Sequence, residues 1–337
     1  MLMENLIEML TYCRPQGSDT QKDFCIKYLH PTLGKPDKDG NYVKIVGKNP
    51  NVAFAAHHDT VHMREGIQKL KISNNIISLP EGSTSSCLGA DCTTGIWLIL
   101  EMVKAKIPGV YLVHAAEESG CIGSKALVAR NHKWMRQLDA IISFDRKGQE
   151  SIITHQMSFR TCSDDFAVSL ENILDLGLKT DDTGSYTDSN EYAHHVSECT
   201  NLSVGYLNQH TKRETQDMSF AETLRDSLVS ADWSKLKFSR DKNIAEYLSP
   251  LEWDKGYKSY QYNSNYDYAR PRSWEELDSL DDIPKEPLND FDDLLALVQQ
   301  YPYEAAMILE SFGLTAEDFK EEIDPSFYSK AKQYGGK

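Results

Sequence analysis

The stretch that decides the fold is residues 109–123, GVYLVHAAEESGCIG, where a short apolar run leads into two adjacent glutamates and a loop punctuated by glycines. The run from Val110 to Val113 is rich in β-formers, is too short for a buried helix and is bounded by turn residues, so it predicts a buried strand. Because successive side chains of an extended chain point to opposite sides, Glu117 and Glu118 are expected to face apart. This arrangement suits a metal site, in which one carboxylate binds an ion and its neighbour transfers a proton. A solvated acidic loop is the alternative for a Glu-Glu pair taken alone.

Predicted strands and helices alternate on both sides of this run. Strands are expected at residues 42–46, 52–56, 110–113, 140–144, 152–155 and 202–206, and helices at 4–12, 18–29, 94–105, 124–130 and 164–174. Such alternation implies parallel pairing, because the helices serve as crossovers between strands. The sequence therefore predicts an α/β fold, a three-layer sandwich with a mainly parallel central sheet flanked by helices. Ligands of such sheets bind beyond the carboxyl ends of the strands.

The composition describes an acidic chain of 337 residues with a net charge of -15 and a pI of about 5.1. This charge disfavours binding to nucleic acid or to an anionic membrane. The first residues make a poor signal peptide, and no stretch is long and apolar enough to span a bilayer. Seven scattered cysteines, without Cys-x-x-Cys spacing, argue against a disulfide framework and a structural zinc knuckle. We therefore expect a cytoplasmic protein.

The strand at residues 52–56 ends in a His-x-D pattern. Period-two geometry places His57 and Asp59 on one face, so Asp59 can orient the imidazole, as carboxylates commonly do for metal-bound histidines. His58 points the other way and is expected to be a packed or solvated histidine. Taken alone, the pattern is more typical of a structural use than of a metal site.

Three further candidates lie at the ends of predicted elements. Asp91 stands where a glycine-containing loop enters a helix, while Asp145 and His210 each follow a predicted strand. Each has a plain alternative, namely a helix N-cap, an ion pair with Arg146 and a surface turn. Together with His57 and the glutamate pair, however, they match the ligand types of a site that holds two ions and shares one aspartate between them.

With these residues the chain resembles the co-catalytic di-zinc exopeptidases, which include bacterial aminopeptidases, aminotripeptidases and aminoacylases. The resemblance spans roughly residues 4–230, and its closest match is the string Glu-Glu-x-Gly-x-x-Gly-Ser at residues 117–124. The resemblance implies these roles: His57 binds one ion, Asp91 bridges both, Glu117 is the general base, Glu118 binds the other ion, Asp145 completes the ligands of the first ion and His210 those of the second.

Two features depart from the family pattern. Cys92 and Thr93 follow the bridging aspartate, where the family often has a second acid or a methionine and then a lysine. Cys92 is expected to fill a helix start, with a place near the ions as the alternative. The segment between Asp145 and Thr187 is too short for the lid domain of some branches, which favours the lid-less aminopeptidase branch. Residues 187–189 could line the substrate pocket, support His210 or cap a helix.

The resemblance implies a metallo-exopeptidase, an aminopeptidase or dipeptidase, that uses two divalent ions: zinc, with Mn²⁺ or Co²⁺ as alternatives. Glu117 would take a proton from the activated water and pass it to the leaving amine, with Asp59 supporting His57. The expected substrate is a small peptide, and the alternative is an N-acyl amino acid with the same chemistry. A non-enzymatic relative whose acidic tail binds a partner is disfavoured by the complete ligand set.

Composition divides the chain into three segments. Residues 1–240 form the predicted catalytic domain. Residues 241–288 are rich in Tyr, Ser, Asn, Asp and Pro, which predicts an irregular linker or a strap over the surface. Residues 289–337 regain helical periodicity in an acidic context and predict a small helical tail.

Overall fold

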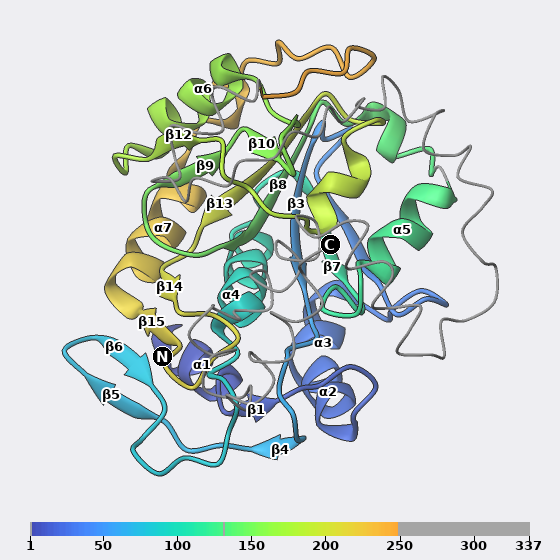
Figure 1. The fold of residues 1–337 in the computed structure, drawn as a ribbon. Helices are drawn as coiled ribbons and strands as arrows, with labels where there is room; N and C mark the ends of the chain where they lie inside the picture. Colours follow the sequence, from blue (N-terminus) through green and yellow to red (C-terminus); the bar gives the residue numbers. More distant parts are fainter. Residues whose placement is uncertain (1, 131, 249–337) are drawn as a thin grey trace, which may run out of the picture. The chain divides into compact units, whose positions relative to one another are not determined.

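A seven-stranded sheet runs through the part of the chain that the computed structural model describes, residues 2–130 and 132–248 (Figure 1). Its strands are β2 (Tyr42–Val46), β3 (Val52–His57), β7 (Gly109–His114), β8 (Ala140–Arg146), β9 (Ser151–Ile153), β12 (Lys179–Asp181) and β13 (Glu198–Ser203). They lie in the order β12-β9-β13-β8-β3-β7-β2. β2 pairs antiparallel with β7, and β9 with β13, whereas the other neighbouring strands are parallel.

Helices cover both faces of this sheet. They are α1 (Leu2–Met9), α2 (Asp19–Phe24), α3 (His30–Leu33), α4 (Ala90–Lys104), α5 (Ile122–Ala129), α6 (Asp164–Leu174) and α7 (Met218–Ser230), with the short turns η2 (Met135–Gln137), η3 (Asp188–Tyr192) and η4 (Trp233–Lys235). Side chains of α1, α2, α4, α6 and α7 share one buried apolar cluster, whereas η2, η3 and α5 pack on a second cluster across the sheet. The predicted three-layer α/β sandwich with a mainly parallel sheet is confirmed.

Strand β3 shows why this architecture buries the candidate site. All six of its residues are buried. Phe54 and Ala56 belong to one apolar cluster and Ala53 and Ala55 to the other, as alternation in a doubly covered strand requires. The strand ends at His57, so this histidine leaves the sheet at its carboxyl edge with protein on both sides.

Several predicted elements end differently in the structure, among them the helix expected over residues 4–12, which ends at Met9. Ser18 caps α2 by accepting the Gln21 N–H at 3.1 Å, but the helix expected over residues 18–29 continues as a π-helical segment, Cys25–Leu29, and then as α3. The strand expected at residues 202–206 is present as β13, but it begins at Glu198 and already ends at Ser203. Gly205 takes φ +94°, a left-handed value that turns the chain out of the central sheet.

The turned-out chain joins a smaller sheet. This sheet has the order β14-β15-β6-β5, with β5 (Lys71–Ser73), β6 (Ile76–Ser78), β14 (Tyr206–Leu207) and β15 (Thr215–Asp217). β5 and β6 pair antiparallel as a hairpin. Two short antiparallel pairs complete the strands: β1 (Tyr12–Cys13) with β4 (Gly66–Ile67), and β10 (His155–Gln156) with β11 (Phe159–Arg160). Helix α7 follows β15 directly.

The beginning of the predicted linker packs on the β10–β11 hairpin. The Arg160 N–H donates to the Glu246 carbonyl at 2.7 Å, and the Leu248 N–H donates to the Ser158 carbonyl at 2.9 Å. The rest of the linker and the predicted helical tail, residues 289–337, lie outside the described residues. Within the described ranges, no helix has the length and apolar character needed to cross a membrane.

Candidate metal centre

The candidate ligands meet at the carboxyl edge of the central sheet. β3 ends at His57, the glutamate pair follows β7, and Asp145 lies near the end of β8. Because these three strands are neighbours and parallel, their ends bring residues from distant parts of the sequence together. Histidine and carboxylate atoms with metal-ligand spacing form overlapping groups here, including the group of Asp91, Glu118 and His210.

Asp91 lies between two histidines from different parts of the fold. Its Oδ1 is 3.0 Å from Nε2 of His57, and its Oδ2 is 3.1 Å from Nε2 of His210. One carboxylate therefore presents a separate oxygen to each half of the centre. This is the arrangement expected of a residue that bridges two ions.

Asp145 belongs to the His57 half. Its Oδ1 is 3.5 Å from Nε2 of His57. Thr187 Oγ1 donates to Asp145 Oδ2 at 3.0 Å, and the Tyr206 hydroxyl donates to Oδ1 at 3.3 Å. The alternative ion pair with Arg146 is not formed, because that guanidinium contacts Asp181 instead.

Glu118 belongs to the His210 half, with 3.2 Å between its Oε1 and Nε2 of His210. Glu117 lies nearer the other histidine, with 3.9 Å between its Oε2 and Nε2 of His57. The expectation that strand geometry turns these glutamates apart is wrong, since β7 ends at His114 and Ala116 takes φ +56°. Both carboxylates turn to the same centre, and an oxygen of each lies within 4.8 Å of the other and of a His57 ring nitrogen.

Asp59 supports both the histidine and the glutamate pair. Its two carboxylate oxygens accept the backbone N–H groups of Glu117 and Glu118, each at 3.1 Å. Nδ1 of His57 lies 3.1 Å from the Asp59 backbone carbonyl and 3.5 Å from its carboxylate. The imidazole is thus oriented mainly by the Asp59 main chain, which leaves the carboxylate to hold the glutamate loop.

His58 is a packed histidine, as expected. It is buried directly after the end of β3. Its Nε2 lies 3.1 Å from the Gly40 carbonyl, an acceptor, so Nε2 carries the hydrogen. Its Nδ1 lies 2.9 Å from Nε2 of Gln21, which donates to it. His58 is therefore held as a neutral imidazole.

Charge accumulates in the centre because several buried carboxyl groups converge. Burial raises the pKa of Asp145 to about 7, and the charge of Asp91 adds to this shift. Burial also raises the pKa of Glu117 well above its ordinary value, with Glu118 contributing. Although burial opposes it, the charge of Glu118 raises the pKa of His210 to about 12. Like charges held this close suit divalent cations, which would relieve the repulsion, so the donor set fits two such ions.

Glu214 is a site residue that sequence reasoning missed. It is fully buried, and its Oε2 accepts the N–H groups of Leu88 and Gly89, each at 2.8 Å. Its Oε1 accepts the N–H of Asp91 at 3.1 Å. A single glutamate in a turn-rich segment carries no sequence signal for this role. Only its position four residues after His210 places it near a candidate ligand in the sequence.

Cys92 is a buried residue beside the centre. Its Sγ donates to the Phe144 carbonyl at 3.0 Å, and its thiol, His57 and Asp145 have ligand atoms within 4.8 Å of one another. Both readings of Cys92 thus describe it in part, since it packs at the start of α4 and also lies close to two ligands. All seven cysteines are free and buried.

Among residues 187–189, Thr187 contacts the His57 side of the centre. Thr187 contacts Asp145, as described above. Asp188 Oδ2 lies 3.0 Å from Nδ1 of His114, and Ser189 Oγ accepts a hydrogen bond from Gln156. The segment between Asp145 and Thr187 forms β9 and β12, which extend the central sheet, together with the β10–β11 hairpin and α6. It does not form a separate lid.

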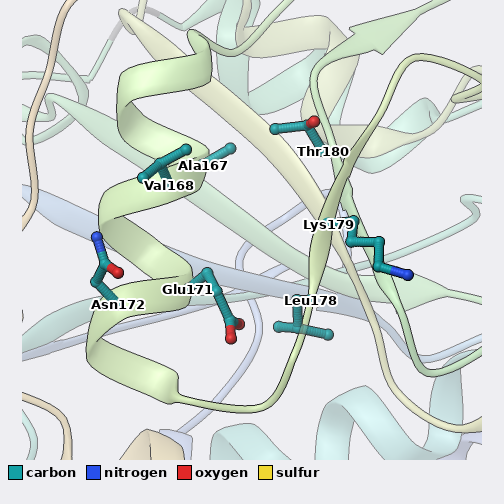
Figure 2. Close-up of a pocket in the computed structure, with 7 residues that line it drawn as sticks. All are labelled: Ala167, Val168, Glu171, Asn172, Leu178, Lys179 and Thr180. Carbon is teal, nitrogen blue, oxygen red and sulfur yellow. The ribbon is translucent and has the colours of Figure 1, made fainter.

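A surface pocket lies elsewhere, between α6 and β12. Val168, Glu171 and Lys179 are among its lining residues (Figure 2). None of the candidate site residues lines it, so it has no part in the centre at the carboxyl edge.

Comparison with known proteins agrees with this geometry. Residues 41–179 match peptidase family M28, a range that contains every candidate ligand except His210. The resemblance to the co-catalytic di-zinc exopeptidases is confirmed. No curated protein matches the chain.

Solved structures of peptidases share the fold. Aminopeptidase PepT from Bacillus cereus matches with a TM-score of 0.56 and 15% identity, covering 68% of this chain and 96% of its own. A tripeptidase from Staphylococcus aureus gives the same values: TM-score 0.56, 15% identity, and coverage of 68% and 96%. The TET1 peptidase of Pyrococcus horikoshii matches with a TM-score of 0.54 and 14% identity over 69% of this chain and 100% of its own. Together with the family match, these similarities support a metal-dependent exopeptidase.

Proposed function

We propose that the protein is an aminopeptidase or dipeptidase that holds two zinc ions at the carboxyl edge of its central sheet. The observation that carries this proposal is the placement of Asp91 between His57 and His210, with one oxygen toward each. His57, Asp145 and Asp91 would hold one ion, and His210, Glu118 and Asp91 the other. Imidazole and carboxylate donors of this kind suit zinc.

The chain supplies a group that can move a proton. Two ions, when bound, polarise the scissile carbonyl and lower the pKa of a water shared between them. Glu117 lies beside the centre and makes no ion pair with a lysine or arginine among the described residues. Its carboxylate takes the proton of the attacking water and passes it to the departing amine. Asp59 fixes the position of this carboxylate through the Glu117 N–H.

The similar structures, which are aminopeptidases and a tripeptidase, support a peptide as the substrate class. We propose a short peptide with a free amino terminus. An N-acyl amino acid presents the same amide to the same centre, so only the free amine separates the two substrate classes.

The test combines metal analysis with turnover. The purified protein should hold about two zinc ions per chain and hydrolyse dipeptides and tripeptides with a free amine, but not their N-acetylated forms. Glu117→Gln should keep its metal and lose roughly 10²- to 10⁴-fold in turnover. Preference for the acetylated substrates would instead show a deacylase. A folded protein that takes up no divalent ion would reject the proposal, and one that binds two ions without turnover would be a non-enzymatic relative.

A further inference from the structure

Arg14 is a fully buried arginine next to β1, with 0% of its surface exposed. Within the described ranges its guanidinium forms no ion pair and donates to neutral oxygens, the carbonyls of Met9 and His58 and the hydroxyl of Thr93. Arg14 also precedes the residues that match the peptidase family, which begin at position 41. It is therefore a buried cation that the N-terminal segment adds to the matched core.

The guanidinium contacts two of the segments that carry ligands of the His57 half, those of His57 and Asp91. Its Nε donates to the His58 carbonyl at 3.2 Å, next to His57. Its Nη2 donates to Thr93 Oγ1 at 2.8 Å, two residues after Asp91. One planar group thus spans from the end of β3 to the start of α4.

Further contacts hold the Arg14 backbone and its guanidinium in place. The Arg14 N–H donates to Thr60 Oγ1 at 3.1 Å, and the Thr60 N–H donates to the Arg14 carbonyl at 3.0 Å. Nη1 donates to the Met9 carbonyl at 3.5 Å, and the guanidinium carbon lies 3.9 Å from the centroid of the Phe24 ring. Thr93 connects Arg14 to the Asp91 loop, because its hydroxyl donates to the Gly89 carbonyl in that loop.

The chemistry of this position indicates that Arg14 orients the segments around it rather than stabilising the apolar core. A buried cation without a carboxylate partner is unfavourable, and an apolar side chain would fill the same space without desolvating a charge. A lysine could not replace this guanidinium, since an ammonium group has no fixed planar donors that reach two separate acceptors. Arginine is therefore the side chain that can hold the end of β3 and the start of α4 at a set distance.

We propose that Arg14 is a positioning residue that fixes the His57 strand end against the Asp91 loop and so sets the spacing of the ligands that would hold the ion of the His57 half. Arg14 touches no ligand side chain and acts through the His58 carbonyl and the Thr93 hydroxyl. The inference rests on the proposed two-ion centre.

The experiment is a calorimetric titration of the full-length, chelator-treated protein with zinc. Arg14→Met should weaken zinc binding by about 10- to 100-fold, the usual effect of removing a group that orients metal ligands. Arg14→Lys should restore little of this loss. The matched control is Arg240→Met, because Arg240 is also buried and is held by the carbonyls of Ala193, Val196 and Ser197. It should leave zinc affinity unchanged.

Two further measurements separate positioning from folding. Thr93→Val removes the acceptor but keeps the buried charge, and the Arg14→Met/Thr93→Val double variant should bind zinc about as weakly as the worse single variant. In peptide assays, kcat should fall in Arg14→Lys while KM stays near normal. If Arg14→Met does not fold, Arg14→Lys and Thr93→Val decide the matter.

The outcomes distinguish this inference from the proposed function. Unchanged zinc affinity and kcat in folded Arg14→Lys and Thr93→Val would overturn the role of Arg14 and leave the two-ion centre standing. Failure of the unmodified protein to bind zinc would overturn the proposed function itself.

Discussion

The carboxylate of Glu214 accepts the backbone N–H of Asp91, with 3.1 Å between Glu214 Oε1 and the Asp91 nitrogen. The same side chain holds two further N–H groups of the loop that leads to Asp91. A buried carboxylate that accepts several backbone donors is strongly anchored, because hydrogen bonds to charged groups are among the strongest in proteins. The loop conformation that presents Asp91 to both histidines is therefore fixed by a side chain from beyond β14.

Glu214→Gln should weaken zinc binding by about 10- to 100-fold, because an amide offers one acceptor oxygen where three N–H groups need partners. Titration calorimetry measures this directly. Glu198→Gln is the matched control, since Glu198 is also fully buried and accepts the N–H groups of Ser163, Ser239 and Arg240. It should lower the melting temperature without changing zinc affinity. Equal zinc affinity in Glu214→Gln and the unmodified protein would show that the loop holds without this anchor.

Glu118→Gln should lose one of the two ions, because a neutral amide is a poor zinc ligand and Glu118 is a carboxylate neighbour of His210. Elemental analysis should find about one ion per chain, whereas Glu117→Gln should retain about two. Metal loss of the same size in both variants would mean that the roles within the glutamate pair are assigned wrongly.

His58→Gln should make the stability of the folded protein less sensitive to acidic pH. Burial lowers the pKa of His58 to about 4 from its ordinary 6.5. An unfolded histidine therefore takes up a proton between these values while the folded one does not. The stability that His58 contributes is fully present above pH 6.5 and is lost as the pH falls toward 4. Melting temperatures recorded between pH 7.5 and pH 5 should fall less in the variant. Parallel curves for the two proteins would contradict a buried neutral His58.

The division into a catalytic domain over residues 1–240, a linker over 241–288 and a tail over 289–337 is a proposal that truncation can test. Deleting residues 271–337 should leave zinc content and peptide turnover intact, since every proposed ligand precedes residue 211. Unfolding or metal loss in the shortened protein would show that the tail belongs to the core.

Much of the fold could be predicted from the sequence, because short contiguous patterns of residues indicate its strands and helices. The apolar runs that became β3, β7 and β8 are short and contiguous, and the helices between them have clear periodicity. Asp91 and Asp145 could be proposed because each lies at the end of such an element. The resemblance then supplied their roles.

The remaining contacts could not be predicted because they depend on tertiary packing. Arg14, Thr187 and Glu214 reach the centre from segments whose position the local pattern does not reveal. The orientation of the glutamate pair was wrong for a related reason. The end of β7 at His114 depends on the loop that follows it, in which Ala116 adopts a left-handed conformation.

The position of Asp91 between His57 and His210 has a consequence for biosynthesis. The ribosome delivers His57 early and His210 last among the proposed ligands, so the nascent chain holds an incomplete set until β13 and β14 have been made and docked. Divalent ions that bind this set bind the finished fold in preference to the unfolded chain, and by mass action they increase the folded population. The amount of this protein that a cell maintains should therefore depend on how much metal the cell can supply.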